Sequence, residues 1–314
     1  MFHYYGFGLS ISSEMEFPEL LSSEAGDAQV SITFGKVPAQ IDGIGITSPN
    51  FSYTIGEEEL LFTVTDIVRY HASNGNSITV EILSATEEKR TIRLYILATV
   101  MAAILLQRRE LPLHASAIIK DGMLILLSGD SGAGKSTLLA ELIKSGYQVF
   151  SDDIVVLKKD MLTGGVVASA SYPMIKLWND SIEKLDHVRF SDKSFKVRHD
   201  LDKYGFFFHS IFRTGSFPVS KILLLKKGSQ EGFLMKEQKD SEAFTAIFKQ
   251  VYRPMLVQGN RHRLLCFTTI SELAKSCTVM EITRPMECQP TELLAYVMDH
   301  FIEENIRGKR SGKI

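Results

Sequence analysis

The stretch MLILLSGDSGAGKST, residues 123–137, decides how this chain folds. The apolar run from Met123 to Leu127 predicts a buried strand, and the residues from Lys135 onward predict a helix. Between them the sequence fits the pattern G-x-x-x-x-G-K-[ST] without a gap. In that pattern the glycines let backbone N–H groups wrap around a phosphate at the N-terminus of the helix. Strand, loop and helix together predict an α/β domain that binds phosphate.

This loop predicts a nucleotide site for ATP and Mg²⁺. We expect Lys135 to reach the β- and γ-phosphates and the Ser136 hydroxyl to bind Mg²⁺. The residues expected to contact the nucleotide are Gly129, Asp130, Ser131, Gly132, Ala133, Gly134, Lys135, Ser136 and Thr137. A glycine-rich turn without a ligand is the alternative, and the flanking strand and helix argue against it.

Two adjacent carboxylates, Asp152 and Asp153, follow the helix at the end of a second strand-like segment, residues 147–151. One carboxylate can bind the metal while the other accepts a proton from an incoming hydroxyl group. His114 opens the pair of predicted strands that leads into the phosphate loop. A solvated turn at the aspartates and a structural role for the histidine are the alternatives.

These residues, in this order, resemble the HPr kinase/phosphorylase family, whose nucleotide domain is akin to that of ATP-dependent PEP carboxykinase. The resemblance implies that Asp152 is the catalytic base toward a substrate serine, that Asp153 helps to bind Mg²⁺, and that His114 and Lys135 complete the active site. It also implies an α/β catalytic domain over residues 111–314. The strand-like pattern of the preceding residues predicts a smaller, mostly β domain with a closing helix over residues 1–110, and its acidic charge suggests a role in recognising the substrate. The family's Arg-Gly-rich segment downstream of the aspartates is not found, so a reversible, regulated HPr kinase is not expected.

Two further segments, YGFGLSI (residues 5–11) and LHASA (residues 113–117), look like those of shorter HPr kinase-like proteins from peptide-modification pathways. Some of these proteins phosphorylate the C-terminal serine of lasso-peptide precursors. The resemblance therefore implies a serine kinase whose partner is a peptide or small protein, with Asp152→Asn expected to abolish transfer while ATP binding persists. HPr protein and free serine remain alternative acceptors, and an ATP-binding regulator without transfer remains an alternative of another class. HPr kinases form ring-shaped hexamers, so a homo-oligomer fits the resemblance.

Charge is distributed unevenly along the 314 residues. Residues 1–110 hold 7 Lys or Arg against 14 Asp or Glu, whereas residues 111–314 hold 28 against 23, which gives net charges of −7 and +5. The excess of positive charge in the second part suits an anionic ligand. Two ordinary surfaces that happen to differ are the alternative.

The remaining composition excludes several classes of protein. Three cysteines without a C-x-x-C pair argue against a disulfide framework and a zinc site, and suit a reducing cytoplasm. The first residues lack the basic start and apolar run of a signal peptide. The apolar stretch from Ile92 to Leu106 is shorter than the ~20 residues that span a bilayer, so we expect a buried helix and no membrane. The basic tail has no interleaved aromatic residues, so no nucleic acid is expected either.

The elements predicted around the phosphate loop alternate between strand and helix. Predicted strands cover residues 7–11, 30–34, 51–55, 60–64, 115–120, 123–128, 148–151, 154–157 and 219–225, with a hairpin at 66–82; predicted helices cover 87–109, 135–144, 241–252 and 290–306. The polar residues 179–204 predict a mobile loop whose cations Lys196, Arg198, His199 and Lys203 either meet the γ-phosphate or are solvated. Trp178, the only tryptophan, either walls a ligand site or packs in the core.

Overall fold

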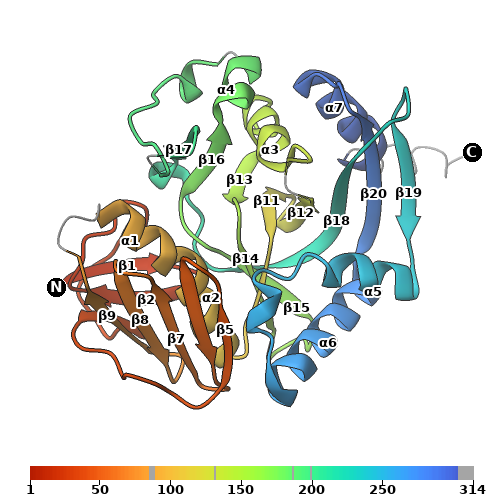
Figure 1. Ribbon diagram of the computed structural model, residues 1–314. Coiled ribbons are helices and arrows are strands. Elements are labelled where there is room, and N and C mark those ends of the chain that lie inside the picture. Colours follow the sequence, from red (N-terminus) through yellow and green to blue (C-terminus); the bar gives the residue numbers. More distant parts are fainter. Residues whose placement is uncertain (85–88, 131, 186, 199, 303–314) are drawn as a thin grey trace, which may run out of the picture.

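The computed structural model describes residues 1–84, 89–130, 132–185, 187–198 and 200–302. Two large mixed sheets dominate it, and Figure 1 shows the N-terminal sheet set against one side of the C-terminal sheet. A single hydrophobic cluster continues from one sheet to the other, because it includes Phe62 and Leu106 as well as Leu111 and Leu126. The domain boundary expected at residues 110 and 111 falls between the last helix of the first part and the first strand of the second, and it stays a prediction.

The N-terminal sheet has the strand order β3-β1-β2-β4-β9-β8-β7-β6-β5. Its strands are β1 (Phe2–Gly6), β2 (Leu9–Ser13), β3 (Leu21–Ser22), β4 (Val30–Phe34), β5 (Ile44–Thr47), β6 (Phe51–Ile55), β7 (Glu59–Val64), β8 (Val68–Ser73) and β9 (Ser77–Ile82). The predicted strands at 30–34, 51–55 and 60–64 and the hairpin at 66–82 are confirmed, with Asn74 and Gly75 at positive φ in the turn. The strand predicted at 7–11 is confirmed only from Leu9, where β2 begins, because Phe7 and Gly8 form the turn between β1 and β2.

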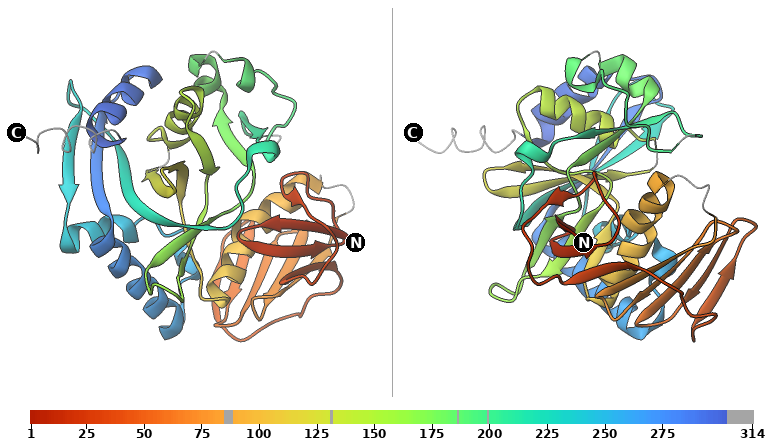
Figure 2. Two further views of the ribbon diagram at one scale, coloured as in Figure 1. Left: turned by 180° about the vertical axis from the view of Figure 1, so that it is seen from behind. Right: turned by 90° about the vertical axis from the view of Figure 1, so that its left-hand side faces the viewer.

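One apolar helical segment covers a face of this sheet (Figures 1 and 2). It consists of α1 (Lys89–Tyr95), a π-helical turn (Ile96–Val100) and α2 (Met101–Gln107). The span Lys89–Gln107 is long and apolar enough to cross a membrane, but 78% of its most apolar window is buried inside the protein. The prediction of a buried helix is therefore confirmed, while its expected start at Glu87 lies outside the described residues.

The C-terminal sheet has the order β10-β14-β15-β18-β12-β11-β13, and β20 and β19 continue it beyond β18. Its strands are β10 (Leu111–Leu113), β11 (Ala115–Lys120), β12 (Met123–Gly129), β13 (Gln148–Ser151), β14 (Val155–Lys159), β15 (Val166–Ala170), β18 (Ser216–Gly228), β19 (Leu234–Gln238) and β20 (Thr278–Pro285). β12, β18 and β20 run parallel to one another, so their carboxyl ends meet at one edge. Ligands of α/β sheets bind outside such an edge.

Helices cover this sheet and close over its edge (Figure 1). They are α3 (Lys135–Lys144), α4 (Asn179–Leu185), α5 (Asp240–Phe248), α6 (Gly259–Ser276) and α7 (Pro290–Val297), the last followed by a π-helical turn (Met298–Ile302). The helix predicted at 135–144 is confirmed, with Gly146 at φ 88° after its end. The helix predicted at 241–252 ends four residues early, because the chain turns before Tyr252 to form part of the site below.

The loop predicted over residues 179–204 is only partly confirmed: residues 191–198 and 200–202 form no helix or strand, but the segment also contains regular elements. It begins with α4, continues through a 3₁₀ turn (Val188–Phe190), and ends at β17 (Lys203–Phe207), which pairs with β16 (Met174–Trp178). Apolar side chains fix this segment, because Ile182, Leu185 and Phe190 are buried against α3 and its neighbours. Their wide spacing among charged residues concealed them in the sequence.

Candidate active site

The phosphate loop leaves the carboxyl end of β12 and enters α3 through backbone that only glycine adopts easily. Gly129 has φ 130°, and a Cβ there would lie 2.0 Å from the carbonyl oxygen of Leu225. Gly132 and Gly134 have φ values of 74° and 108°. Ala133 donates its N–H to the carbonyl oxygen of Asp130 at 3.1 Å, while Ser131 lies outside the described residues. The loop therefore packs closely against Leu225 of β18 at its start, and Gly132 and Gly134 beyond it line the pocket.

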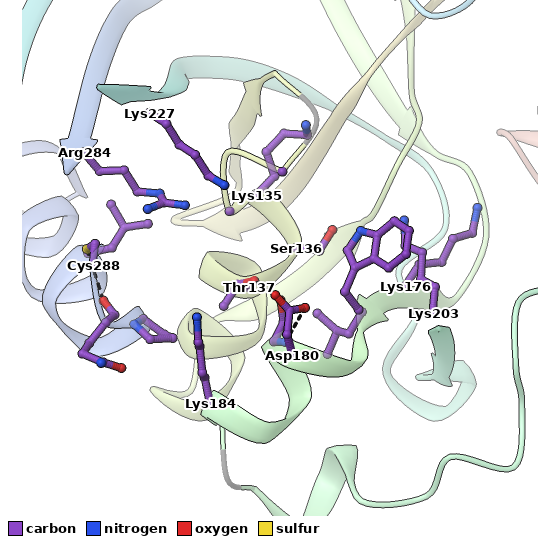
Figure 3. A pocket seen from close by; sticks show the side chains of 18 of the residues that line it. Lys135, Ser136, Thr137, Lys176, Asp180, Lys184, Lys203, Lys227, Arg284 and Cys288 are labelled. Atoms are coloured by element: carbon purple, nitrogen blue, oxygen red, sulfur yellow. Dashed lines mark hydrogen bonds between the residues drawn. The ribbon is translucent and has the colours of Figure 1, made fainter. Parts of the chain in front are cut away.

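Neighbouring parallel strands bring two cations to the same edge. Lys227 comes from the end of β18 and Arg284 from the end of β20. The Arg284 Nε donates to the carbonyl oxygen of Ala133 at 2.8 Å, which ties β20 to the loop. Figure 3 shows both side chains on the loop's side of the pocket.

A pocket of about 910 Å³ opens over the loop, large enough for a nucleotide and part of a second substrate. Among the described residues that line it, the bases outnumber the acids. The bases are Lys135, Lys176, Lys184, Lys203, Lys227 and Arg284; the acids are Asp152, Asp153, Asp180 and Glu287. This excess of positive charge favours an anionic ligand.

Lys135 lies buried at the base of the pocket. Its Nζ donates to the carbonyl oxygens of Gly129 at 2.8 Å and Asp130 at 3.1 Å. Burial lowers the pKa of Lys135, and the nearby carboxylates of Asp152 and Asp153 oppose that effect. The ammonium group therefore sits at the loop with two acids beside it, as the sequence predicted.

The buried Asp152 carboxylate accepts hydrogen bonds from three donors. Its Oδ1 accepts from the hydroxyl groups of Ser116 at 2.6 Å and Ser136 at 3.2 Å, and its Oδ2 accepts from the backbone N–H of Lys176 at 2.9 Å. The residue is only 2% exposed. Asp152 thus faces the hydroxyl group that the loop motif assigns to Mg²⁺.

Asp153 points to a different set of partners because its backbone has φ 70°. Its Oδ2 accepts from the Lys176 Nζ at 2.8 Å, and its Oδ1 lies 3.5 Å from the His114 Nδ1. Burial would raise the pKa of Asp153, but the charges of Lys176 and His114 outweigh it and hold that pKa well below its usual value. Asp153 therefore stays ionised against the pocket wall.

His114 lies between the aspartates and a segment distant in sequence. Its Nδ1 is 3.0 Å from the carbonyl oxygen of Asp153, and its ring centroid is 5.9 Å from that of Tyr252. Burial lowers the pKa of His114, and Asp153 partly offsets this. The structure thus brings His114, Lys135 and both aspartates together, as the sequence predicted.

Three residues that the sequence did not predict complete the site. Lys176 in β16 is buried and pairs with Asp153. Tyr252 lies near His114, and the Gln250 Oε1 accepts from the Gly129 N–H and the Ser128 hydroxyl, each at 3.1 Å. No motif marks Gln250 or Tyr252. Lys176 lies two residues before Trp178, which is 43% exposed and lines the pocket.

The predicted basic cluster is divided by the structure. Lys203 lines the pocket, with its Nζ 5.4 Å from the Trp178 ring. Lys196 and Arg198 are not among the described lining residues: Arg198 pairs with Asp200, and the Lys196 carbonyl oxygen accepts from Arg90. The structure does not place these two side chains at the pocket, and their contact with the γ-phosphate stays a prediction. His199 lies outside the described residues.

Comparisons with known proteins give weak, local similarity to one family. No family model matches the chain. It is 43% identical over 56 residues to the HPr kinase/phosphorylase of Chlorobaculum tepidum, which covers 18% of this chain and 16% of that protein. It is 38% identical over 63 residues to the HPr kinase/phosphorylase of Clostridium tetani, which covers 20% of each. The matches thus span at most a fifth of the relatives' length.

A solved structure, the Hpr(Ser) kinase/phosphatase from Coxiella burnetii, covers 64% of this chain and 94% of its own. Its sequence identity to this chain is 16% and its TM-score is 0.33. The chain therefore has weak sequence homology to HPr kinase/phosphorylase, confined to a short part of its length.

Proposed function

We propose that this protein is a cytoplasmic, Mg²⁺- and ATP-dependent kinase that phosphorylates a serine hydroxyl group. The observation that carries the proposal is the placement of Asp153 on the pocket wall, between His114 and Lys176 and beside the phosphate loop. A protein that only binds a nucleotide has no need of a second carboxylate held in that way. The local similarity to HPr kinase/phosphorylase supports the same reaction class.

The residues at the loop fit Mg²⁺ with a phosphate chain. Mg²⁺ prefers oxygen ligands and usually binds through one or two protein groups together with substrate phosphates. The Ser136 hydroxyl and the Asp152 carboxylate form such a pair, 3.2 Å apart. Among the described residues no cluster of three or more His, Cys, Asp or Glu could hold a metal, which agrees with a site that phosphates complete. Bound there, Mg²⁺ would offset charge on the phosphates.

The geometry favours a different division of labour between the aspartates from the one that the resemblance implied. Both Asp152 oxygens accept hydrogen bonds, from Ser116, Ser136 and the Lys176 backbone N–H. This carboxylate is fixed beside the Ser136 hydroxyl, which suits it to bind the metal together with that hydroxyl. Asp153 reaches the pocket wall, where its carboxylate oxygens lie 2.8 Å from the Lys176 Nζ and 3.5 Å from the His114 Nδ1. We therefore assign Asp153 to the acceptor hydroxyl and Asp152 to Mg²⁺.

In this assignment Asp153 orients the serine hydroxyl toward the γ-phosphorus. The hydroxyl oxygen forms the new P–O bond while the bond to the bridging oxygen of ADP breaks, and the hydroxyl proton passes to the Asp153 carboxylate. Because phosphoryl transfer has a loose transition state, positioning and charge contribute more than basicity. The low pKa of Asp153 is compatible with that role, and Lys135 and Lys176 offset negative charge on the transferring group.

For the acceptor we propose the C-terminal serine of a ribosomally made peptide, such as a lasso-peptide precursor. A terminal serine carries a carboxylate beside its hydroxyl group, and Lys203 and Lys184 offer positive charge on the wall that also holds Trp178. HPr protein and free serine are the competing acceptors. A serine within a folded protein has no such carboxylate to meet these lysines.

The proposal is tested by incubating the full chain with Mg²⁺ and ATP and one acceptor at a time. The acceptors are a serine-ended peptide, its C-terminally amidated twin, HPr protein and free serine, each analysed by mass spectrometry. We expect one added phosphoryl group on the serine-ended peptide and little on its amide. Tight ATP binding with no transfer to any acceptor would instead favour an ATP-binding regulator.

A further inference from the structure

The turn between β1 and β2, Gly6-Phe7-Gly8, leaves the N-terminal sheet and enters the catalytic part of the molecule. The Phe7 N–H donates to the carbonyl oxygen of Ser171 at 2.6 Å, and the Phe7 side chain is fully buried. Ser171 lies between β15 and β16, directly behind the paired aspartates. A residue near the start of the chain is thus packed beneath the candidate active site.

The two glycines let this turn approach closely. A Cβ on Gly6 would lie 2.8 Å from Leu20 Cδ2 and 3.2 Å from the Ser171 carbonyl oxygen. Gly8 has φ 76°, and a Cβ there would lie 2.8 Å from the Ser169 hydroxyl oxygen. Phe7 itself has φ 58°, a backbone conformation that is unfavourable for a bulky residue. Such a conformation persists only where surrounding contacts hold it, and the Ser171 hydrogen bond and the buried ring supply them.

A continuous set of contacts joins this turn to Asp153. The Phe7 ring lies 5.6 Å from the Tyr172 ring, and the Tyr172 ring lies 5.4 Å from the Lys176 Nζ. The Lys176 Nζ in turn donates to Asp153 at 2.8 Å. Behind them the Ser171 hydroxyl contacts the Ser151 hydroxyl at 3.0 Å and the Asp152 carbonyl oxygen at 3.4 Å.

We propose that the turn Gly6–Gly8 is a positioning element of the phosphoryl-transfer site, acting through Tyr172 and Lys176 on the Asp153 carboxylate. The proposal rests on the function proposed above, and it gives the N-terminal sheet a role in catalysis apart from substrate recognition. A buried ammonium group keeps its place only if its partners are fixed. The Tyr172 ring is one of those partners, and Phe7 is the residue that fixes it from the other side.

The experiment compares Phe7→Leu with Phe62→Leu in the full chain. Phe62 is also fully buried in the N-terminal sheet, but it packs on Tyr53, Tyr70 and Tyr95. Both changes remove a buried ring and cost similar stability. We expect Phe7→Leu to lower kcat about 10- to 100-fold with the Kd for ATP changed less than about threefold, because a misplaced group costs rate rather than binding. We expect Phe62→Leu to leave kcat near that of the unmodified chain.

A second readout does not depend on any acceptor. The Lys176 ammonium group is followed by ¹⁵N NMR of lysine-labelled protein, with Lys176→Met to assign its signal. We expect a slowly exchanging signal that shifts or broadens in Phe7→Leu and in Tyr172→Leu but persists in Phe62→Leu. Equal effects of Phe7→Leu and Phe62→Leu on kcat and on this signal would overturn the proposal, and so would no effect of Phe7→Leu on either.

Failure of the proposed kinase function would give a different result from failure of the positioning role. If the unmodified chain phosphorylated no acceptor, the kinase assignment would fail. The lysine signal would still decide whether the turn fixes Lys176. If Phe7→Leu does not fold, Tyr172→Phe and Tyr172→Leu are compared instead. Tyr172→Phe keeps the aromatic ring, so we expect its Lys176 signal to shift or broaden less than that of Tyr172→Leu; equal signals in the two variants would contradict the proposal.

Discussion

The two flanks of the pocket differ in how tightly their side chains are held. The inner flank consists of His114, Asp152, Asp153 and Lys176, each of which has a hydrogen-bonded or charged partner and rests on buried residues. The outer flank is the segment 286–293, where Met286 is 63% exposed, while the capping box between Gln289 and Glu292 and the buried side chain of Leu293 hold the start of α7. Residues that position the reacting groups must be held in place, whereas residues that only admit a ligand need not be. We therefore expect changes on the inner flank to lower kcat and changes on the outer flank to alter binding.

The largest effect is expected for Asp153→Asn. An amide cannot accept the hydroxyl proton, so phosphoryl transfer should fall by about 10²–10⁴-fold. The side chain keeps its size, so ATP binding measured by calorimetry should change little. Transfer at more than a tenth of the original rate would remove Asp153 from the role assigned to it.

Lys176→Met comes next. The change leaves Asp153 without its strongest partner, and we expect kcat to fall about 10- to 100-fold. Lys176→Arg restores the charge in a larger, planar group, so it should recover part of the rate but not all of it. The two variants are compared by steady-state kinetics with ATP saturating. Equal rates for both would mean that the charge at this position is irrelevant.

The Asp153–Lys176 pair also predicts how stability depends on pH. The folded-state pKa of Asp153 is depressed, so its contribution to stability is present above the unfolded-state value of about 3.9 and is lost as pH falls below it. The pKa of Lys176 is raised, so its contribution is lost only at strongly alkaline pH. Urea unfolding should show that Asp153→Asn is less stable than the original chain by about 3 kcal/mol at pH 7, with the difference narrowing below pH 4. A constant gap from pH 7 to pH 3 would argue that the pair is not formed.

The smallest effect is expected on the outer flank. Met286→Ala removes an exposed apolar side chain that a nucleotide would cover, so the KM for ATP should rise about two- to fivefold while kcat stays within about twofold. A matched change at Met161, which is 90% exposed and does not line the pocket, should alter neither constant. A large loss of kcat in Met286→Ala would erase the contrast between the two flanks.

The sequence predicts those parts of the site that lie close together along the chain. The phosphate loop, its strand and its helix form one local motif, and the fold places His114 and the aspartates beside it. Gln250 and Tyr252 could not be predicted, because a loop more than a hundred residues away brings them to the site and no motif marks them. The α6 helix was missed for a related reason: its buried face includes His262, Cys266 and Thr269, which break the apolar repeat.

The roles of the adjacent aspartates show a further limit. The sequence shows that two aspartates are adjacent, but it does not show which groups each carboxylate contacts. Here the positive φ of Asp153 turns it toward Lys176 and His114 while Asp152 stays with Ser136. That conformation is a tertiary property, since contacts from β16 and His114 hold it. The sequence of the two aspartates alone therefore does not predict this backbone conformation.

In the proposed site, Asp152 binds Mg²⁺ and Asp153 accepts the proton of the acceptor hydroxyl group. The most direct test is the rate of phosphoryl transfer to the serine-ended peptide, measured across a range of Mg²⁺ concentrations for the original chain, Asp152→Asn and Asp153→Asn. We predict that Asp152→Asn needs more Mg²⁺ and recovers much of its rate at high Mg²⁺, whereas Asp153→Asn stays slow at every concentration with an unchanged Mg²⁺ requirement. The reverse pattern, with Asp153→Asn rescued by Mg²⁺ and Asp152→Asn inactive throughout, would contradict the account.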